Sequence, residues 1–440
     1  MSACRSTSGR TLEDFREIDQ QNRRHYADRK LYRFGVRKVH DVAAGDLILF
    51  GVVTLTAQEA TELGRSEGQM LYFPDLESLT VEVVSELAKW RGGVLHLNKV
   101  DTLDEEVGAE LAKWGGWDLR LNGLKRLDAK AASNLAKWEG TSLHLNGLEV
   151  LGEKVASKLA KWEGERLFLK GMETLDAEVA AGLAKWEGES LYLNGVQVLD
   201  GEAVSELAKW GGVGLHLNGV ETLDGEVASE LAKWRGVGLH LNGLVTLDQE
   251  VASKLAKWEG EYLYLNGLAM LDEAVASKLV QWAGGNLYLN GVKALDKEVA
   301  SKLAKWEGED LNLNGLKALD DEAGAELAKW EGRDLGLDGL VTLDEAVAAS
   351  LAKWGGRSLH LNGLKTLDEE AASKLAQWKG DRLFLNGLEA LDERVASKLA
   401  PWEGRHLSLN GLEDLDEKVA SMLGPWWRSL NAPGLPRNPG

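Results

Sequence analysis

The stretch LHLNGLVTLDQEVASKLAKWEGEY, Leu239 to Tyr262, is one copy of a 24-residue repeat that occupies most of the chain. Fifteen copies follow one another without insertion or deletion, the first opening at Leu71 and the last at Leu407, and a degenerate sixteenth opens at Leu47. A fixed period of this length is typical of a solenoid, in which each repeat contacts its neighbours and the stack shares one core. The repeat therefore decides the fold class.

Within each repeat, numbered from its first Leu, the apolar spacing changes from that of a strand to that of a helix. Leu239 and Leu241 at positions 1 and 3 alternate as on a strand with one buried side. Asn-Gly at positions 4 and 5 predicts a backbone turn that glycine tolerates. After Asp248 at position 10, the apolar positions 13, 17 and 20 follow one helix face, and Gly260 at position 22 is expected to end the helix after Trp258.

Two positions hardly vary from repeat to repeat. Position 10 is Asp in thirteen of the fifteen repeats, with Thr80 and Gly152 as the exceptions, and we expect it to cap the helix. Position 20 is Trp in all fifteen, from Trp90 to Trp426. A ladder of indoles could serve electron transfer or ligand stacking, but a large apolar residue at the same helix end in every repeat predicts a buried core.

The repeats predict one array over residues 47–430, with a leader and basic helical cap over 1–46 and a disordered tail over 431–440. Thr11 and Asp14 resemble a capping box at the start of the cap. Residues 1–40 hold ten Lys or Arg and five Asp or Glu. We expect this basic segment to cover the first repeat; the alternative is a docking or nucleic-acid-binding segment.

Composition limits the possible partners and location. The net charge of the 440 residues is −19, so we do not expect the array to bind nucleic acid, because such binding depends on neutralising phosphates. No apolar run approaches the ~18 residues of a membrane helix, which predicts no membrane span. A single cysteine, Cys4, cannot form an internal disulfide, and this favours a reducing cytoplasm. We expect a cytoplasmic monomer.

The pattern LxLNGLxxLDxEVAxxLAxW resembles the leucine-rich repeat, most closely its bacterial members. The resemblance implies an α/β fold: a right-handed leucine-rich repeat solenoid with parallel strands on the concave face and helices on the convex face. It also implies a general role in protein recognition. One departure is that Asn follows the second Leu directly, where the usual pattern is LxLxxNxL. Whether the Asn column forms an inward ladder or faces outward stays open.

The residues at position 2, between the two buried leucines, are expected to face outward, and eleven of the fifteen are His, Tyr or Phe. Exposed Tyr and His favour a recognition surface, although stacked rings could also only stabilise adjacent strands. We expect the contact centre beside Gly214 and Gly238, where missing side chains leave a recess walled by Tyr262. The predicted partner-binding residues are His144, Phe168, Tyr192, His216, His240, Tyr262, Tyr264 and Tyr288.

Other site chemistry has little support in the sequence. His216 and His240 converge poorly for a metal, and no nucleophile elbow, phosphate-binding loop, dinucleotide fingerprint or zinc-protease motif occurs. We therefore expect no cofactor, no metal and no enzyme activity. The leading hypothesis is a scaffold that binds another protein through the position-2 residues. The alternatives are a structural or assembly protein, or an effector whose basic amino-terminal segment docks elsewhere.

Overall fold

A computed structural model describes residues 46–412 and 416–424. The predicted leader, basic cap and tail lie outside these residues, as do the Thr11 capping box, Cys4 and Trp426. The contacts between Cα atoms divide the chain into two compact units, residues 1–219 and 220–440, here called unit 1 and unit 2. The predicted extent of the array, residues 47–430, stays a prediction.

Unit 1 alternates short strands with short helices. Its strands are β1 (Leu47–Ile48), β2 (Met70–Tyr72), β3 (Val94–His96), β4 (Asp118–Arg120), β5 (Ser142–His144), β6 (Arg166–Phe168), β7 (Ser190–Tyr192) and β8 (Gly214–His216). Its helices are α2 (Ala57–Leu63), α3 (Val81–Leu87), α4 (Glu105–Leu111), α5 (Ala129–Leu135), α6 (Glu153–Leu159), α7 (Ala177–Leu183) and α8 (Gly201–Leu207).

Unit 2 repeats the same alternation. Its strands are β9 (Gly238–His240), β10 (Tyr262–Tyr264), β11 (Asn286–Tyr288), β12 (Asp310–Asn312), β13 (Asp334–Gly336), β14 (Ser358–His360), β15 (Arg382–Phe384) and β16 (His406–Ser408). Its helices are α9 (Gly225–Leu231), α10 (Gln249–Leu255), α11 (Glu273–Leu279), α12 (Lys297–Leu303), α13 (Asp321–Leu327), α14 (Glu345–Leu351), α15 (Glu369–Leu375), α16 (Glu393–Leu399) and α17 (Glu417–Met422).

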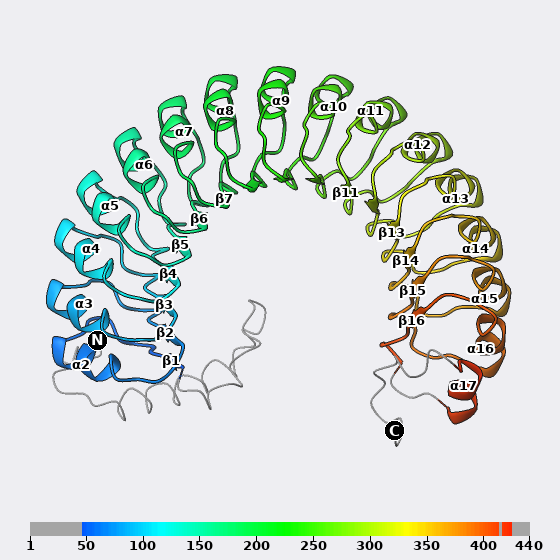
Figure 1. Ribbon diagram of the computed structural model, residues 1–440, viewed down its shortest axis with the longest axis horizontal. Helices are drawn as coiled ribbons and strands as arrows, with labels where there is room; N and C mark the ends of the chain where they lie inside the picture. The colour runs from blue at the N-terminus through cyan, green and yellow to red at the C-terminus, as the bar shows by residue number, and fades with distance from the viewer. Residues whose placement is uncertain (1–45, 413–415, 425–440) are drawn as a thin grey trace, which may run out of the picture. The chain divides into compact units, whose positions relative to one another are not determined.

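Within each unit the strands form an open parallel sheet in chain order, and the helices follow the other side (Figure 1). Equivalent residues face each other across the strands; Leu263, for example, pairs with Leu287. The degenerate repeat is part of this order, because Leu47 of β1 pairs with Leu71 of β2. The leucines at positions 1 and 3 are buried throughout the described repeats. These 24-residue strand–helix repeats have the predicted leucine-rich repeat architecture.

The helices begin as predicted but end sooner. The Asp248 side chain accepts a hydrogen bond from the backbone N–H of Val251 at 2.8 Å, whereas Gly152 offers its helix no side-chain cap. The prediction that the helix runs to Trp258 is wrong: α10 ends at Leu255. The N–H of Trp258 bonds the carbonyl of Leu255, three residues back, at 2.9 Å, so a tighter turn replaces the last helical turn.

The tryptophans form an indole ladder inside each unit, as predicted. The position-20 indoles, from Trp90 to Trp402, are each at most 2% exposed, whereas Trp117, which is not at position 20, is 48% exposed. Neighbouring rings within a unit stack with centroids 5.8–6.0 Å apart, as Trp258 does on Trp282 at 5.9 Å. Burying about 200 Å² of apolar surface contributes on the order of 5 kcal/mol per indole. This ladder is a main source of stability.

The glycine at position 22 serves the indole rather than the helix end. A Cβ atom on Gly260 would lie 1.9 Å from Cζ2 of Trp258, far inside contact distance. The same clash, at 1.9–2.0 Å, occurs at this position in every described repeat from Gly92 to Gly404. Glycine is therefore required because the ring packs flat against the backbone.

The glycine of the Asn-Gly turn has a similar role. The sequence predicts a turn that glycine tolerates, and among the described glycines only Gly51 and Gly424 have positive φ. A Cβ atom on Gly147 would lie 2.3 Å from the carbonyl oxygen of Asn122 and 2.6 Å from that of Leu124. The turn therefore needs glycine because the backbone of the preceding repeat approaches closely.

Candidate functional site

The position-2 residues, here called the ring column, end each strand with their side chains on the outer face of the sheet. Strand alternation explains this, because the leucines on either side of them point into the core. Strand register then places each ring beside its equivalent in the next repeat, as His144 beside Phe168. Every aromatic member of the column is half-buried.

In unit 1 the predicted residues come together in one continuous stack. Ring centroids lie 3.9 Å apart between His144 and Phe168, 4.0 Å between Phe168 and Tyr192, and 3.9 Å between Tyr192 and His216. The ring planes are within 14° of parallel. Lys170, which replaces the usual Asn, places its Nζ 5.7 Å from the Phe168 ring centre. Each inner ring covers its neighbours' faces, so what it presents outward is its edge.

Unit 2 also carries stacked rings. His240 and Tyr264 lie 3.9 Å apart, and Tyr264 and Tyr288 lie 4.2 Å apart. Asn312 and Gly336 then interrupt the rings, and the column resumes with His360 on Phe384 at 4.3 Å. Within unit 2 the rings thus form two groups, one on each side of Asn312 and Gly336.

The spacing of the rings reports how each unit bends. Equivalent rings occupy the same place in successive repeats, so the distance between their centres reflects the local spacing of the repeats together with the tilt of the rings. In unit 1 this spacing is 3.9 Å on the outer strand face, between His144 and Phe168, but 5.9 Å between Trp138 and Trp162 inside. Parallel strands themselves are about 4.8 Å apart. Within the unit the repeats therefore converge toward the ring column, which lies on the concave side.

The recess predicted beside the glycines is partly filled by the histidines. In unit 1, a Cβ atom on Gly214 would lie 3.5 Å from Nε2 of His216, so the imidazole leans over the glycine of its own strand. In unit 2, His240 does the same over Gly238 at 3.6 Å. Tyr262, the predicted wall, is half-buried on the strand that follows Gly238. The glycines accommodate the imidazoles rather than leaving open space.

The Asn column combines both orientations that the sequence left open. Its side chains form a ladder: Oδ1 of Asn290 accepts a hydrogen bond from the backbone N–H of Asn314 at 2.9 Å. The same column lies beside the ring column, since Nδ2 of Asn410 donates to Oγ of Ser408 at 3.1 Å, and Ser408 occupies position 2. The amides therefore tie the repeats together and border the outer face.

A charged cluster in unit 1 was not predicted. The Arg120 guanidinium, itself in the ring column, donates to both carboxylate oxygens of Asp118 at 3.0 and 2.9 Å. Nε2 of His144 lies 3.3 Å from the same carboxylate. Burial raises the pKa of Asp118, but these two partners outweigh it and hold that pKa well below its usual range. The sequence hides this cluster because its members come from two neighbouring strands, β4 and β5.

The equivalent position in unit 2 has the opposite electrostatics. Asp310 of β12 pairs in register with Asp334 of β13, so two carboxyl groups share one place on the sheet. Burial and the facing Asp334 raise the pKa of Asp310 to about 6. Burial also lowers the pKa of His240 to about 4 and, together with the Arg120 charge, that of His96 to about 4. These imidazoles are neutral at pH 7.

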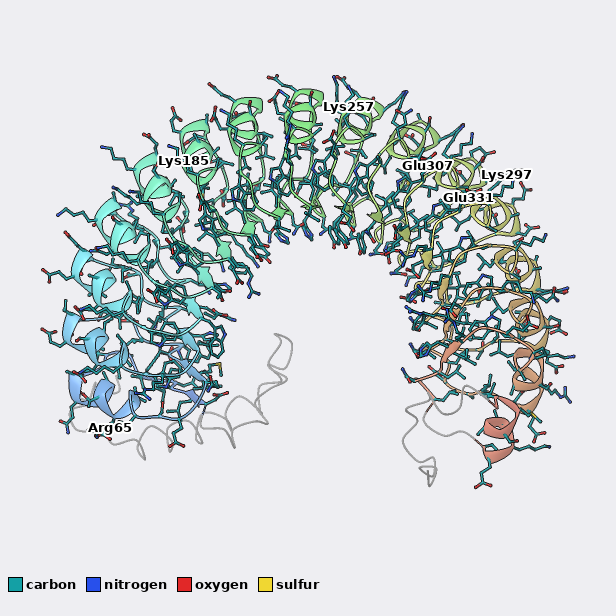
Figure 2. The ribbon with its side chains drawn as sticks, viewed as in Figure 1. Arg65, Lys185, Lys257, Lys297, Glu307 and Glu331 are labelled. Atoms are coloured by element: carbon teal, nitrogen blue, oxygen red, sulfur yellow. The ribbon has the colours of Figure 1, made fainter. Side chains whose placement is uncertain are left out.

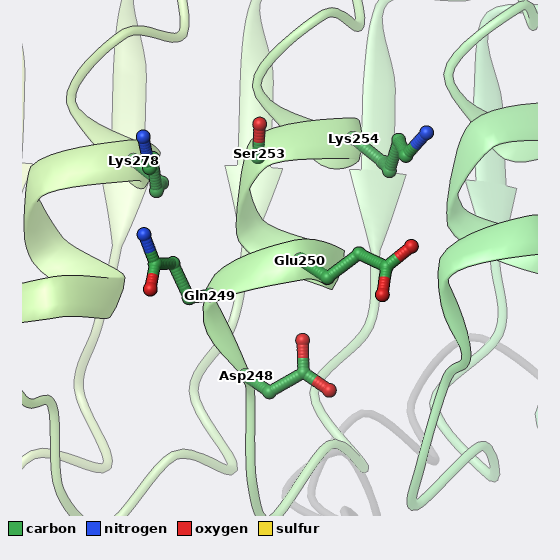
Figure 3. A pocket seen from close by; sticks show the side chains of 6 residues that line it. All are labelled: Asp248, Gln249, Glu250, Ser253, Lys254 and Lys278. Carbon is green, nitrogen blue, oxygen red and sulfur yellow. The ribbon is translucent and has the colours of Figure 1, made fainter.

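The helix side offers a shallow depression between α10 and α11 (Figure 3). It is lined by Asp248, Gln249, Glu250, Ser253, Lys254 and Lys278. Asp248 is occupied in capping α10, and lysines such as Lys185 and Lys257 extend from this side of the chain (Figure 2). Within residues 46–412 and 416–424, no cluster of three or more His, Cys, Asp or Glu could hold a metal ion, and no helix could cross a membrane.

No family model matches the sequence, and no curated protein does. Solved structures with a similar trace include an internalin from Listeria monocytogenes, at 20% identity and a TM-score of 0.44 over 74% of this chain and 88% of that one. The Toll–Spatzle complex of Drosophila is similar at 12% identity and a TM-score of 0.45, over 78% of this chain and 54% of that one. A TLR13–ssRNA13 complex is similar at 18% identity and a TM-score of 0.43, over 83% of this chain and 54% of that one. With TM-scores this low, the fold assignment rests on the strands and helices of this chain alone.

Proposed function

We propose that this chain is a non-enzymatic scaffold that binds another protein through its ring column. The observation that carries the proposal is the stacking of His, Tyr and Phe rings on the outer strand face, half-buried in each other and open along their edges. The predicted contact residues all lie in or beside these stacks: His144, Phe168, Tyr192 and His216 in unit 1, and His240, Tyr262, Tyr264 and Tyr288 in unit 2.

The stacks have the physical properties of a binding surface. A ring held between two neighbours has already lost most of its rotamer freedom, so a partner that contacts it causes little further loss of entropy. Ring edges, Tyr hydroxyls and imidazole nitrogens supply apolar contact and hydrogen bonds from one side chain. The bordering Asn amides supply the polar rim that protein interfaces usually have. Stacking also stabilises adjacent strands, and the two roles are compatible.

The test is a triple substitution in the ring column. A partner isolated from the native host, with the array as bait, is titrated against wild type and against the variant His216→Ser, His240→Ser, Tyr264→Ser. We expect a loss of at least about a hundredfold in affinity, because clustered aromatic contacts carry most of the energy of an interface. The matched control replaces three exposed lysines at position 19, Lys185→Ser, Lys257→Ser and Lys305→Ser, and should retain affinity.

Equal affinity of the two variants would contradict the proposal. The assembly alternative predicts a different behaviour, in which the chain associates with itself. Sedimentation of the wild-type chain over a wide concentration range distinguishes the two, since a scaffold that acts as a monomer keeps one sedimentation coefficient. Polymers that disappear in the ring-column variant would favour assembly over the binding of a separate protein.

A further inference from the structure

Three arginines gather at the amino ends of neighbouring strands in unit 2. Arg357 directly precedes β14, Arg382 opens β15, and Arg405 directly precedes β16. All three side chains are exposed, with Arg405 at 80% and Arg357 at 43%. In a chain with a net charge of −19, three exposed arginines on three consecutive repeats are a local reversal of sign.

One carboxylate holds two of these arginines in place. Asp381, the residue before Arg382, accepts from Nε of Arg357 at 3.2 Å and from Nη2 of Arg405 at 2.8 Å, so it joins the repeats on either side of its own. The hydrogen bonds from Arg405 and Arg357 lower the pKa of Asp381, which therefore stays ionised. Within the described residues, no carboxylate pairs with Arg382.

The charges around the cluster leave it positive. Two guanidinium groups share the one carboxylate of Asp381, and Arg382 has no carboxylate partner among the described residues, so the three arginines carry more positive charge than this carboxylate compensates. The nearby acid Glu403 is paired with Lys379 at 2.9 Å and does not compensate them. Asp381 fixes two arginines without neutralising both of them, since it accepts hydrogen bonds from Nε of Arg357 and from Nε and Nη2 of Arg405.

One member of the cluster, Arg382, adjoins the ring column. Arg382 and Phe384 are two residues apart on β15 and so lie on the same face. Phe384 stacks on His360 at 4.3 Å, and the His406 ring lies 5.5 Å away at a steep angle of 53°. An anion bound by the arginines would therefore lie next to the ring edges, whose partial positive charge also favours negative groups.

We infer that Arg357, Arg382 and Arg405 form an anion-binding site that receives the acidic side chains of a partner's peptide segment. The planar guanidinium binds carboxylate or phosphate through two parallel hydrogen bonds, and a preorganised pair needs little rearrangement to do so. Naming the partner segment as acidic rests on the proposed function, whereas the anion site itself stands apart from it.

A labelled hexaglutamate peptide, titrated against the full chain at low salt and followed by fluorescence anisotropy, tests the inference. We expect saturable binding that the double variant Arg382→Gln, Arg405→Gln weakens by about tenfold or more, since charge-assisted hydrogen bonds are lost. The matched control is Arg394→Gln, an arginine on α16 that is also 80% exposed and paired with a carboxylate, and it should bind like wild type. Thermal unfolding of each variant verifies that the fold is retained.

Two further probes identify the anion. The first is the same peptide with phosphoserine in place of glutamate. It binds more tightly than hexaglutamate if the site prefers phosphate, and with equal affinity if the site accepts carboxylates. Both results support an acidic segment. A single-stranded oligonucleotide that depends on the same arginines and binds more tightly than either peptide would overturn it. So would hexaglutamate affinity that is absent or unchanged in the double variant.

The anion site and the proposed function can fail independently, and the two experiments distinguish these outcomes. If the ring-column variant keeps its partner while hexaglutamate binding depends on Arg382 and Arg405, the anion site stands and the ring proposal fails. If the ring-column variant loses its partner while the arginine variants bind hexaglutamate like wild type, only the anion site fails.

Discussion

The chain carries two aromatic rows with the same 24-residue period, one inside and one outside. The indole ladder is at most 2% exposed and uses one residue type, whereas the ring column is half-buried and mixes His, Tyr and Phe. Ring centres are 5.9 Å apart in the first row and about 3.9 Å apart in the second. The difference shows that the packed interior requires one ring shape, whereas the outer face accommodates any flat ring that can stack.

Removing one indole should cause the largest loss. Trp258→Ala leaves a large cavity between Trp282 and the rest of the core, and we expect stability to fall by about 3–5 kcal/mol. Urea unfolding of the full chain, followed by circular dichroism, measures this. If the free energy of unfolding fell no more than on removal of an outer ring, the indole ladder would not be the more stabilising of the two rows.

Adding one methyl group beside an indole should cause a smaller loss. In Gly356→Ala the new Cβ would lie 1.9 Å from Cζ2 of Trp354, and overpacking of this kind costs about 1–3 kcal/mol. The neighbouring Gly355 is the control, because a Cβ atom there meets nothing within 4 Å. Similar denaturation midpoints for the two alanine variants would show that the indole does not require glycine.

Removing one outer ring should cost less than removing an indole. Tyr264→Ser breaks contacts with His240 and Tyr288, and each stacked pair contributes about 0.5–1.5 kcal/mol. Tyr264→Phe keeps both contacts and should unfold like wild type. Urea unfolding of both variants checks this, and a serine variant as stable as the phenylalanine variant would show that stacking contributes nothing.

A further effect should appear with pH. Burial lowers the folded-state pKa of His240 to about 4, below the value of ~6.5 in an unfolded chain. The unfolded chain therefore binds a proton first, and the contribution of His240 to stability is complete above pH 6.5 and is lost as the pH falls toward 4. His240→Phe keeps a stacked ring without a titrating group, so its stability should fall less than that of wild type between pH 7 and pH 4.5.

Parallel unfolding curves for wild type and His240→Phe across this range would show that the imidazole is not desolvated. The pH dependence of stability of His240→Phe is subtracted from that of wild type, because carboxylates elsewhere in the chain titrate in the same range and affect both proteins equally.

Much of the fold could be predicted because it follows from spacing within one repeat. The alternation of Leu239 and Leu241, the Asp248 cap and the burial of Trp258 depend on neighbours a few residues away. The helix end was missed because Trp258 continues the apolar stripe of the helix. Only the structure shows that hydrogen bonds to carbonyls three residues back close the turn at Leu255.

The site was less predictable because its contacts join residues of different repeats. Strand alternation places His144 and Tyr264 outward, and this was predicted. The leaning of His240 over Gly238, the Asp118 cluster and the bridging of two arginines by Asp381 depend on side-chain rotamers, which no spacing rule supplies. The two uses of the Asn ladder likewise appear only when successive repeats are stacked.

The most direct test of the division between a stabilising interior and a binding exterior is photocrosslinking in the native host. A benzophenone amino acid replaces either Tyr264 in the ring column or Lys257 on the helix side (Figure 2). Both positions are in the same part of unit 2. A partner protein crosslinked from position 264 and not from position 257 is the expected result. A partner crosslinked only from position 257 would contradict the account.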